Sequence, residues 1–342
     1  MKFGPVSLDQ AQGKILGHNV TGPDGRRLFR KGHALEAEDI ERLRELGRQT
    51  VYVAELELDD VDENSAAARI ADKLFDHRYF RLSGPSTGRA NVYTTELGVL
   101  RVEVDRLLEI NRNEGITLAT LRHNSAVTEG KIAATLKVLP YAIPKTMVHR
   151  AEALARENGP LLNLDPLAPR QVSLILSGSP SARERIVHSF ENALSQRLEN
   201  LGASIDTVDF VVLDQEEDEA ALAEMIDRRI EGGAELVILA GETAIMDRYD
   251  IAPRAVERAG GTVVCYGAPV DPGNLLMLGR LGDTPVLGAP GCARSPKDNI
   301  IDLVLPRLLV GDRLERDDII SMAHGGLLED VPERPSPRSR LT

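Results

Sequence analysis

The strongest constraint on the fold is a regular alternation of apolar, strand-like runs and helical segments between residues 171 and 309. Strands that alternate with helices predict right-handed βαβ crossovers, which place helices on both faces of a mostly parallel sheet. We therefore expect a mostly parallel, three-layer α/β domain over 171–312. The expected strands are 171–176, 209–213, 235–240, 262–266 and 284–287, and the expected helices are 183–201, 220–230, 251–259 and 298–309.

The residues before this domain predict smaller α+β domains, because 342 residues are too many for one small core. Apolar spacing indicates helices at 34–46 and 98–111 and strands at 50–54 and 116–121, whereas 127–135 fits either a helix or a strand. The expected divisions are 1–56 (a small α+β unit), 57–90 (a helix at 65–75 and a linker at 83–89), 91–157 (a second α/β unit), 158–170 (a Pro-containing linker), 171–312 (the α/β domain) and 313–342 (a tail, partly disordered).

Composition excludes several classes of function. The chain has no Trp, six Tyr and six Phe, and its net charge is −12, which argues against a nucleic-acid partner. Only two cysteines are present and no CxxC occurs, so a disulfide framework or structural zinc site is not expected. No apolar leader or run of 18 apolar residues is present, so we expect a cytoplasmic protein with no membrane partner. An acidic protein can still hold a small anion through backbone N–H groups.

Ligands of open α/β sheets bind beyond the carboxyl ends of the strands, so the residues that follow each strand are the candidate site. After the first expected strand, Ser177 and Gly178 precede Ser179 and Pro180, which fit the cap and first residue of a helix. Free N–H groups at such a helix start suit a phosphate. A plain turn between strand and helix fits these residues equally well.

The next two strands are followed by acidic residues. Asp214 lies at the tip of the second, and a ten-residue loop that starts Gly241-Glu242-Thr243 follows the third. Asp247 in this loop could coordinate Mg²⁺, which favours one or two carboxylates plus phosphate oxygens. Asp250 fits either a ligand or the cap of the next helix.

The fourth and fifth strands are followed by turns rich in Pro and Gly. Pro269 and Gly273 fix the first of these turns, and the second runs from 288 to 297. We expect Ser295 to cap a helix there. Basic residues at a helix start oppose its dipole unless an anion is bound, and this favours an anionic ligand. The candidate binding residues of this second turn are Pro290, Gly291, Cys292, Arg294, Ser295 and Lys297.

Cys292 in this turn could also be a nucleophile, because a thiol near a helix start and Arg294 can have a lowered pKa. No His lies in any of these loops to act as its base, so binding is the preferred interpretation. The patterns GxGxxG and GxxxxGK[ST] are both absent, which argues against a dinucleotide or P-loop nucleotide site.

These turns resemble those of the molybdopterin-binding (MoaB/Mog) domain, and the whole chain resembles MoeA-type molybdopterin molybdotransferases. The likeness rests on Leu-Ser-Gly at 176–178, on Gly241 and Asp247, and on GAPGCARSPK at 288–297. It also includes VDPGNLL at 270–276, where it is most similar to molybdopterin-binding halves joined to a cytidylyltransferase. Weaker matches before the domain lie at 11–16, 25–35 and 116–121.

The resemblance implies a molybdenum-cofactor biosynthesis protein that binds molybdopterin or its nucleotide form at the strand tips. It implies Asp214 and Asp247 as catalytic and Mg²⁺-binding residues for molybdate insertion. The sequence departs from the family motif at Glu242, Ala244, Met246 and Cys292. Glu242 replaces a Gly and adds negative charge where the backbone should approach an anion, which weighs against molybdate insertion more than against pterin binding.

Three functions remain open on the sequence. The first is an enzyme that inserts molybdate into adenylylated molybdopterin with Mg²⁺, using metal charge and positioning. The second is a non-catalytic carrier that serves a cytidylyltransferase or a molybdoenzyme. The third is a doubly wound domain for another ligand, such as a nucleotide. A homodimer is open under each of these functions.

Overall fold

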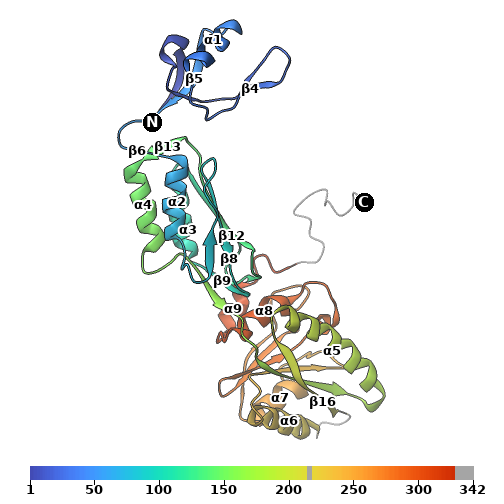
Figure 1. Ribbon diagram of the computed structural model, residues 1–342. Coiled ribbons are helices and arrows are strands. Elements are labelled where there is room, and N and C mark those ends of the chain that lie inside the picture. The colour runs from blue at the N-terminus through green and yellow to red at the C-terminus, as the bar shows by residue number, and fades with distance from the viewer. Residues whose placement is uncertain (214–217, 328–342) are drawn as a thin grey trace. The chain divides into compact units, whose positions relative to one another are not determined.

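The structure is a computed structural model that describes residues 1–213 and 218–327 (Figure 1). Contacts divide the chain into two compact units. The second contains 165–327 together with two short segments, 97–99 and 124–126, and the first contains the remaining described residues. Among the described residues no helix is long and apolar enough to cross a membrane.

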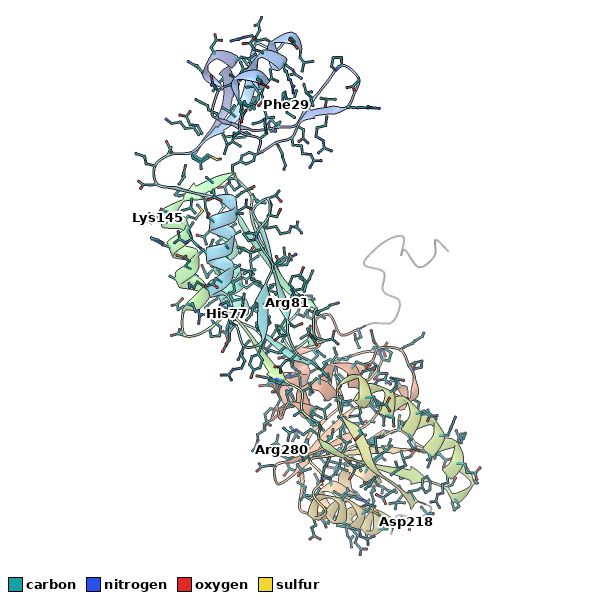
Figure 2. All side chains as sticks on the ribbon, in the orientation of Figure 1. Phe29, His77, Arg81, Lys145, Asp218 and Arg280 are labelled. Atoms are coloured by element: carbon teal, nitrogen blue, oxygen red, sulfur yellow. The ribbon has the colours of Figure 1, made fainter. Side chains whose placement is uncertain are left out.

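The first 56 residues have a small core of their own. Phe29 and Leu43 are buried in it, and Figure 2 marks Phe29 in this part of the chain. Helix α1 follows its cap residue Glu36, which forms a capping box with Asp39. The sheet has the order β1-β5-β2 and a separate hairpin pairs β3 with β4. The elements are β1 (Lys2–Ser7), the 3₁₀ helix η1 (Leu8–Gln10), β2 (Ile15–Leu16), β3 (Val20–Thr21), β4 (Arg27–Phe29), α1 (Ala37–Glu45) and β5 (Thr50–Glu55).

The residues from 60 to 166 form a second core, in which helices pack on small antiparallel sheets. The sheets have the orders β10-β12-β8-β7, β11-β9-β14 and β13-β6. The elements are β6 (Asp60–Asp62), α2 (Glu63–Lys73), β7 (Phe80–Leu82), β8 (Arg89–Thr94), β9 (Gly98–Val102), α3 (Val104–Asn111), β10 (Ile116–Thr120), β11 (Ala126–Val127), β12 (Ile132–Val138), β13 (Ala142–Pro144), α4 (Lys145–Arg156) and β14 (Leu162–Pro166).

The second unit is built on a six-stranded sheet of order β16-β15-β17-β20-β19-β18. Strand β15 is parallel to β16 and β17, β17 is parallel to β20, and β19 is antiparallel to both of its neighbours, β18 and β20. The carboxyl ends of all strands but β19 therefore lie at one edge. The strands are β15 (Gln171–Gly178), β16 (Ser204–Val212), β17 (Leu236–Gly241), β18 (Thr262–Tyr266), β19 (Met277–Leu281) and β20 (Thr284–Gly288).

Helices cover both faces of this sheet. One core contains α5 and α8 with alternate strand residues such as Leu174 and Ile238, and the other contains α6 and α7 with Ile175 and Leu239. The mostly parallel, three-layer α/β domain predicted from the alternation is confirmed. Figure 2 labels two residues of this unit, Arg280 on β19 and Asp218 at the cap of α6. The helices are η2 (Pro180–Ala182), α5 (Arg183–Asn200), α6 (Glu219–Glu231), α7 (Ile251–Arg258), η4 (Gly291–Arg294), α8 (Ile300–Leu309) and α9 (Arg316–Ser321).

Several expected elements differ from the structure. The helix expected over 98–111 is strand β9 followed by α3. Val99, Leu100 and Val102 are buried, and buried residues next to each other fit a strand that is covered on both faces. The residues 127–135, which fitted either a helix or a strand, contain the end of β11 at Val127 and the start of β12 at 132–135, with a turn between them. The expected linkers at 83–89 and 158–170 hold part of the β7–β8 hairpin connection and strand β14. Strand β19 and helices α4 and α9 were not expected.

Candidate functional site

A cavity of about 350 Å³ opens at the carboxyl edge of the second unit, at the ends of β15 and β17. Apolar side chains form much of its wall, and Ile175, Leu222 and Ile245 among them belong to the core on the face covered by α6 and α7. The polar residues of its lining are Ser177, Glu242, Thr243 and Asp250. Strand order explains the site, since β15 and β17 are parallel neighbours and their tips meet.

The cavity brings together residues that the sequence placed in two separate turns. Of the predicted binding residues, five line it, and they come from both strand tips. These are Ser177, Gly178, Gly241, Glu242 and Thr243.

Glu242 lies directly against the start of the first helix of this unit. Its Oε2 accepts hydrogen bonds from the backbone N–H of Ser179 at 2.9 Å and from the Ser179 hydroxyl at 2.8 Å. Its Oε1 lies 3.5 Å from the guanidinium of Arg185. The hydrogen bonds from Ser179 lower the pKa of the Glu242 carboxyl, with a smaller contribution from Arg185. Glu242 is therefore ionised and holds the helix start.

Two glycines allow the strand tips to approach this closely. A Cβ on Gly178 would lie 2.8 Å from the Cβ of Glu242 and from Cδ1 of Ile186. A Cβ on Gly241 would lie 2.8 Å from Oγ of Ser177. Gly178 is thus required for the path of the Glu242 side chain.

Ser179 precedes η2 at its cap position with Pro180 at the first position, as predicted, and α5 continues from η2. Its side chain does not cap the helix; instead its backbone N–H and hydroxyl are bound by Glu242. The N–H group expected to face a phosphate therefore already has an anionic partner from the chain itself.

The predicted metal ligands differ in what the structure describes. Asp214 lies outside the described residues. Asp247 accepts a hydrogen bond from the N–H of Tyr249, and Asp250 accepts from the N–H groups of Met246 and Asp247. These bonds fold the loop on itself. Within 1–213 and 218–327 no group of three His, Cys, Asp or Glu residues is placed to hold a metal ion. The role of Asp247 in binding Mg²⁺ stays a prediction.

The turn expected to start a helix at Ser295 is built differently. Gly291–Arg294 form the 3₁₀ helix η4, and α8 begins only at Ile300. Its cap is the buried Asn299, whose side chain accepts from the N–H of Ile301 and forms a capping box with Asp302. The prediction that Ser295 caps the helix is therefore wrong. The side-chain oxygen of Asn299 accepts from the first turn of α8, and its side-chain NH₂ group donates to the carbonyl oxygens of Cys292 and Lys297.

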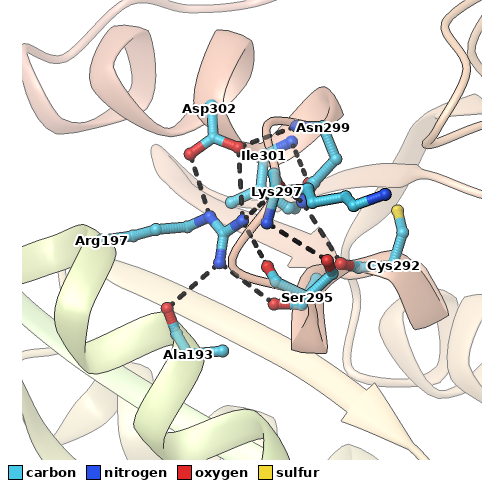
Figure 3. A network of polar contacts seen from close by, with 9 residues as sticks. Ala193, Arg197, Cys292, Ser295, Lys297, Asn299, Ile301 and Asp302 are labelled. Atoms are coloured by element: carbon cyan, nitrogen blue, oxygen red, sulfur yellow. Dashed lines mark hydrogen bonds and ion pairs between the residues drawn. The ribbon is translucent and has the colours of Figure 1, made fainter. Parts of the chain in front are cut away.

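Arg197 on α5 holds this turn in place (Figure 3). Its guanidinium is buried and donates to the carbonyl oxygens of Ser295 at 2.7 Å and Lys297 at 3.0 Å. It also pairs with Asp302, at 2.9 Å between Nε and Oδ1. Sequence reasoning missed Arg197. A signal was present, because residue 197 follows Phe190 and Leu194 at helical spacing and so lies on the buried stripe of α5.

The other predicted residues of this edge are not among the residues that line the cavity. They are Ser179, Asp247, Pro269, Gly273, Pro290, Gly291, Cys292, Arg294, Ser295 and Lys297. The guanidinium of Arg294 lies 5.3 Å from the ring of Phe190 and donates to the carbonyl of Gly291. The hydroxyl of Ser295 accepts from the N–H of Lys297.

The thiol of Cys292 is half-buried, and burial raises its pKa. A raised pKa leaves less thiolate at neutral pH, which argues against the nucleophile interpretation.

The comparisons with known proteins give weak likenesses. The family model described as Domain of unknown function (DUF8806) matches residues 5–55. No curated protein matches the chain. Among solved structures, a molybdenum cofactor biosynthesis protein from Pyrococcus furiosus is 12% identical with a TM-score of 0.25. The match covers 91% of this chain and 64% of that one, so this chain spans less than two thirds of it.

Two further solved structures are similar at the same level. The molybdopterin biosynthesis moeA protein from Pyrococcus horikosii is 14% identical with a TM-score of 0.30, over 91% of this chain and 75% of that one. A structure titled molybdenum cofactor biosynthesis protein B is 18% identical with a TM-score of 0.28, over 42% of this chain and 96% of that one. Such low values leave the functional assignment to the geometry of the site.

Proposed function

We propose that the second unit binds molybdopterin, or a nucleotide conjugate of it, in the cavity between the tips of β15 and β17. The single observation that carries this proposal is that residues predicted to bind the ligand, from two turns far apart in the sequence, line one cavity. Its volume of about 350 Å³ is within the range of small-molecule sites, which is about 300–1,000 Å³. The chain would then serve molybdenum-cofactor biosynthesis.

We further propose that the chain acts as a binding protein without turnover, serving a partner such as a cytidylyltransferase. Asp247 and Asp250 use their carboxylates within their own loop, and Glu242 occupies the helix start where an anion would be held. These contacts favour binding over molybdate insertion. The alternative hypothesis is an enzyme in which Asp214 and Asp247 bind Mg²⁺, and the experiment must distinguish this enzyme from a binding protein.

The test is the affinity of the whole chain for molybdopterin, measured by calorimetry. Ala244 lines the cavity, whereas Ala221 is exposed on α6 and is outside its lining. Ala244→Phe should fill the cavity and weaken binding at least about tenfold, which corresponds to about 1.4 kcal/mol. Ala221→Phe should bind like the wild type.

Equal affinity of both variants would remove the cavity as the site. AMP release from adenylylated molybdopterin that depends on molybdate and Mg²⁺ would replace the carrier by the molybdotransferase. Loss of that release in Asp247→Asn would then assign Asp247 to the reaction.

A further inference from the structure

The start of a helix is ordinarily a place for an anion, because its first N–H groups lack partners within the helix. Here a side chain from a neighbouring strand tip supplies the anion. The carboxylate of Glu242 accepts from both the N–H and the hydroxyl of Ser179, immediately before η2 and α5. A phosphate could bind this N–H only by displacing Glu242 and separating it from Arg185.

The charges around the cavity point in the same direction. Among the described residues that line it there are two carboxylates, on Glu242 and Asp250, and no Arg, Lys or His. Arg185 lies outside this lining and is largely exposed, with 66% of its side chain accessible. A phosphate inside the cavity would face negative charge with no basic group of the lining to compensate it, and such an arrangement is costly where water is excluded.

The other carboxylate oxygen of Glu242, Oε1, can accept hydrogen bonds from N–H groups of a ligand. The Oε2 of Glu242 accepts two hydrogen bonds from Ser179, whereas its Oε1 has, among the described residues, only the long contact of 3.5 Å to Arg185. A carboxylate can accept further bonds, and it pairs best with two adjacent N–H donors. The apolar wall formed by Leu222, Leu239 and Ile245 suits a flat ring.

We propose that Glu242 determines the specificity of this cavity: it closes the helix start to phosphate and accepts N–H donors of a planar nitrogen heterocycle. This inference rests on the proposed function and gives the ligand an orientation. The amino-pyrimidine edge of the pterin ring enters the cavity toward Glu242. The phosphate stays at the exposed side, where Arg185 is available.

The test uses two probes on the full chain, 6-hydroxymethylpterin and inorganic pyrophosphate, with affinities from calorimetry. Wild type should bind the pterin and not pyrophosphate. Glu242→Gln keeps the shape of the side chain and an acceptor for Ser179 but loses the charge, and should bind the pterin at least about tenfold more weakly. Glu242→Ala frees the N–H of Ser179 and should gain pyrophosphate binding.

Glu235 provides a matched control at the other end of β17. Its carboxylate also accepts from a backbone N–H, that of Gln171 at 3.0 Å, and also pairs with an arginine, Arg170. It does not line the cavity at the strand tips. Glu235→Gln should therefore leave both probe affinities as in wild type, whatever its effect on stability.

Failure of this inference is distinguishable from failure of the proposed function. If molybdopterin does not bind but Glu242→Ala gains pyrophosphate, the proposed function is lost and the closure of the helix start to phosphate by Glu242 stands. If wild type binds pyrophosphate in competition with the pterin, or if Glu242→Gln and Glu242→Ala both behave as wild type with both probes, the role of Glu242 is overturned.

Discussion

The turn after β17 and the turn after β20 lie at the same edge of the sheet, and both contain residues that were predicted to bind the ligand. After β17, a carboxylate from the turn binds an N–H group and hydroxyl before a helix. After β20, a guanidinium from a helix binds the carbonyl groups of the turn. A helix start lacks acceptors and an irregular turn lacks donors, and in each turn the chain supplies the missing group itself. Charged residues near a helix start are therefore weak signs of a bound ion until their partners are known.

The largest effect is expected at Arg197, which holds the turn after β20. Arg197→Ala should lower the free energy of unfolding by about 3 kcal/mol, because Asp302 and several buried carbonyls would lose their partner. The value lies at the lower end of the range for buried pairs since the side chain of Asp302 is 31% exposed. Urea unfolding followed by circular dichroism measures it.

Arg197→Lys sharpens the same result. Lysine keeps the charge near Asp302 but cannot donate to several carbonyl groups in fixed directions. The free energy of unfolding should therefore fall between those of wild type and Arg197→Ala. A change of less than about 1 kcal/mol in Arg197→Ala would show that the turn does not depend on the guanidinium.

A smaller effect is expected from Gly273, in the turn that packs on the start of α8. A Cβ there would lie 2.4 Å from Cβ of Ile300, and the φ of Gly273 is +139°. Gly273→Ala should destabilise the protein by about 2 kcal/mol through overpacking and strain. Thermal and urea unfolding give the value.

Gly267→Ala is its matched control in the same turn. Gly267 also has a positive φ, +82°, but the nearest atom to its added Cβ would be 3.8 Å away. Strain alone should cost about 1 kcal/mol there. If the two variants are equally destabilised, the close contact with Ile300 is not what holds the turn against α8.

The smallest effect concerns the carboxylate of Glu242 and appears in the pH dependence of stability. Its folded-state pKa is lowered, so its ionised form stabilises the fold above the unfolded-state pKa. This contribution is lost as the pH falls from the unfolded-state pKa through the lowered folded-state pKa. The difference in stability between wild type and Glu242→Gln should therefore shrink between neutral and acid pH, as followed by urea unfolding.

A difference that stays constant or grows toward acid pH would mean that the charge of Glu242 does not contribute through Ser179. Glu235→Gln should show the same acid trend, because the hydrogen bond from Gln171 and the ion pair with Arg170 also lower the pKa of Glu235.

Much of the second unit could be predicted because its elements are long and regular. The expected strand 262–266 and helix 183–201 lie within a residue of β18 and α5. Strand β19 was missed because it follows a Pro-Gly turn and contains Gly279, so it resembles a loop. Helix α4 was missed because it begins directly after Pro144, within a stretch that has no side-chain cap. Tertiary packing decides such segments more than their own propensity.

Part of the site could be predicted from the parallel arrangement of the strands. Parallel strands place their tips at one edge, so Ser177, Gly241 and Thr243 could be expected together. The bond between Glu242 and Ser179 could not, because it joins residues 63 apart and depends on the room that Gly178 leaves. The partners of Arg197 lie about 100 residues away, on a turn whose path no local pattern describes.

Strand β17 carries a glutamate just before its first residue and another just after its last, and both bind backbone N–H groups of β15 or the residue that follows it. The two bonds bracket the pairing from Val172–Leu236 to Ser177–Gly241. Sliding one strand by a single residue would break both and would turn the buried side chains to the opposite face. The two glutamates thus fix the register of β15 against β17. The backbone amides between them should exchange with deuterium among the slowest in the protein.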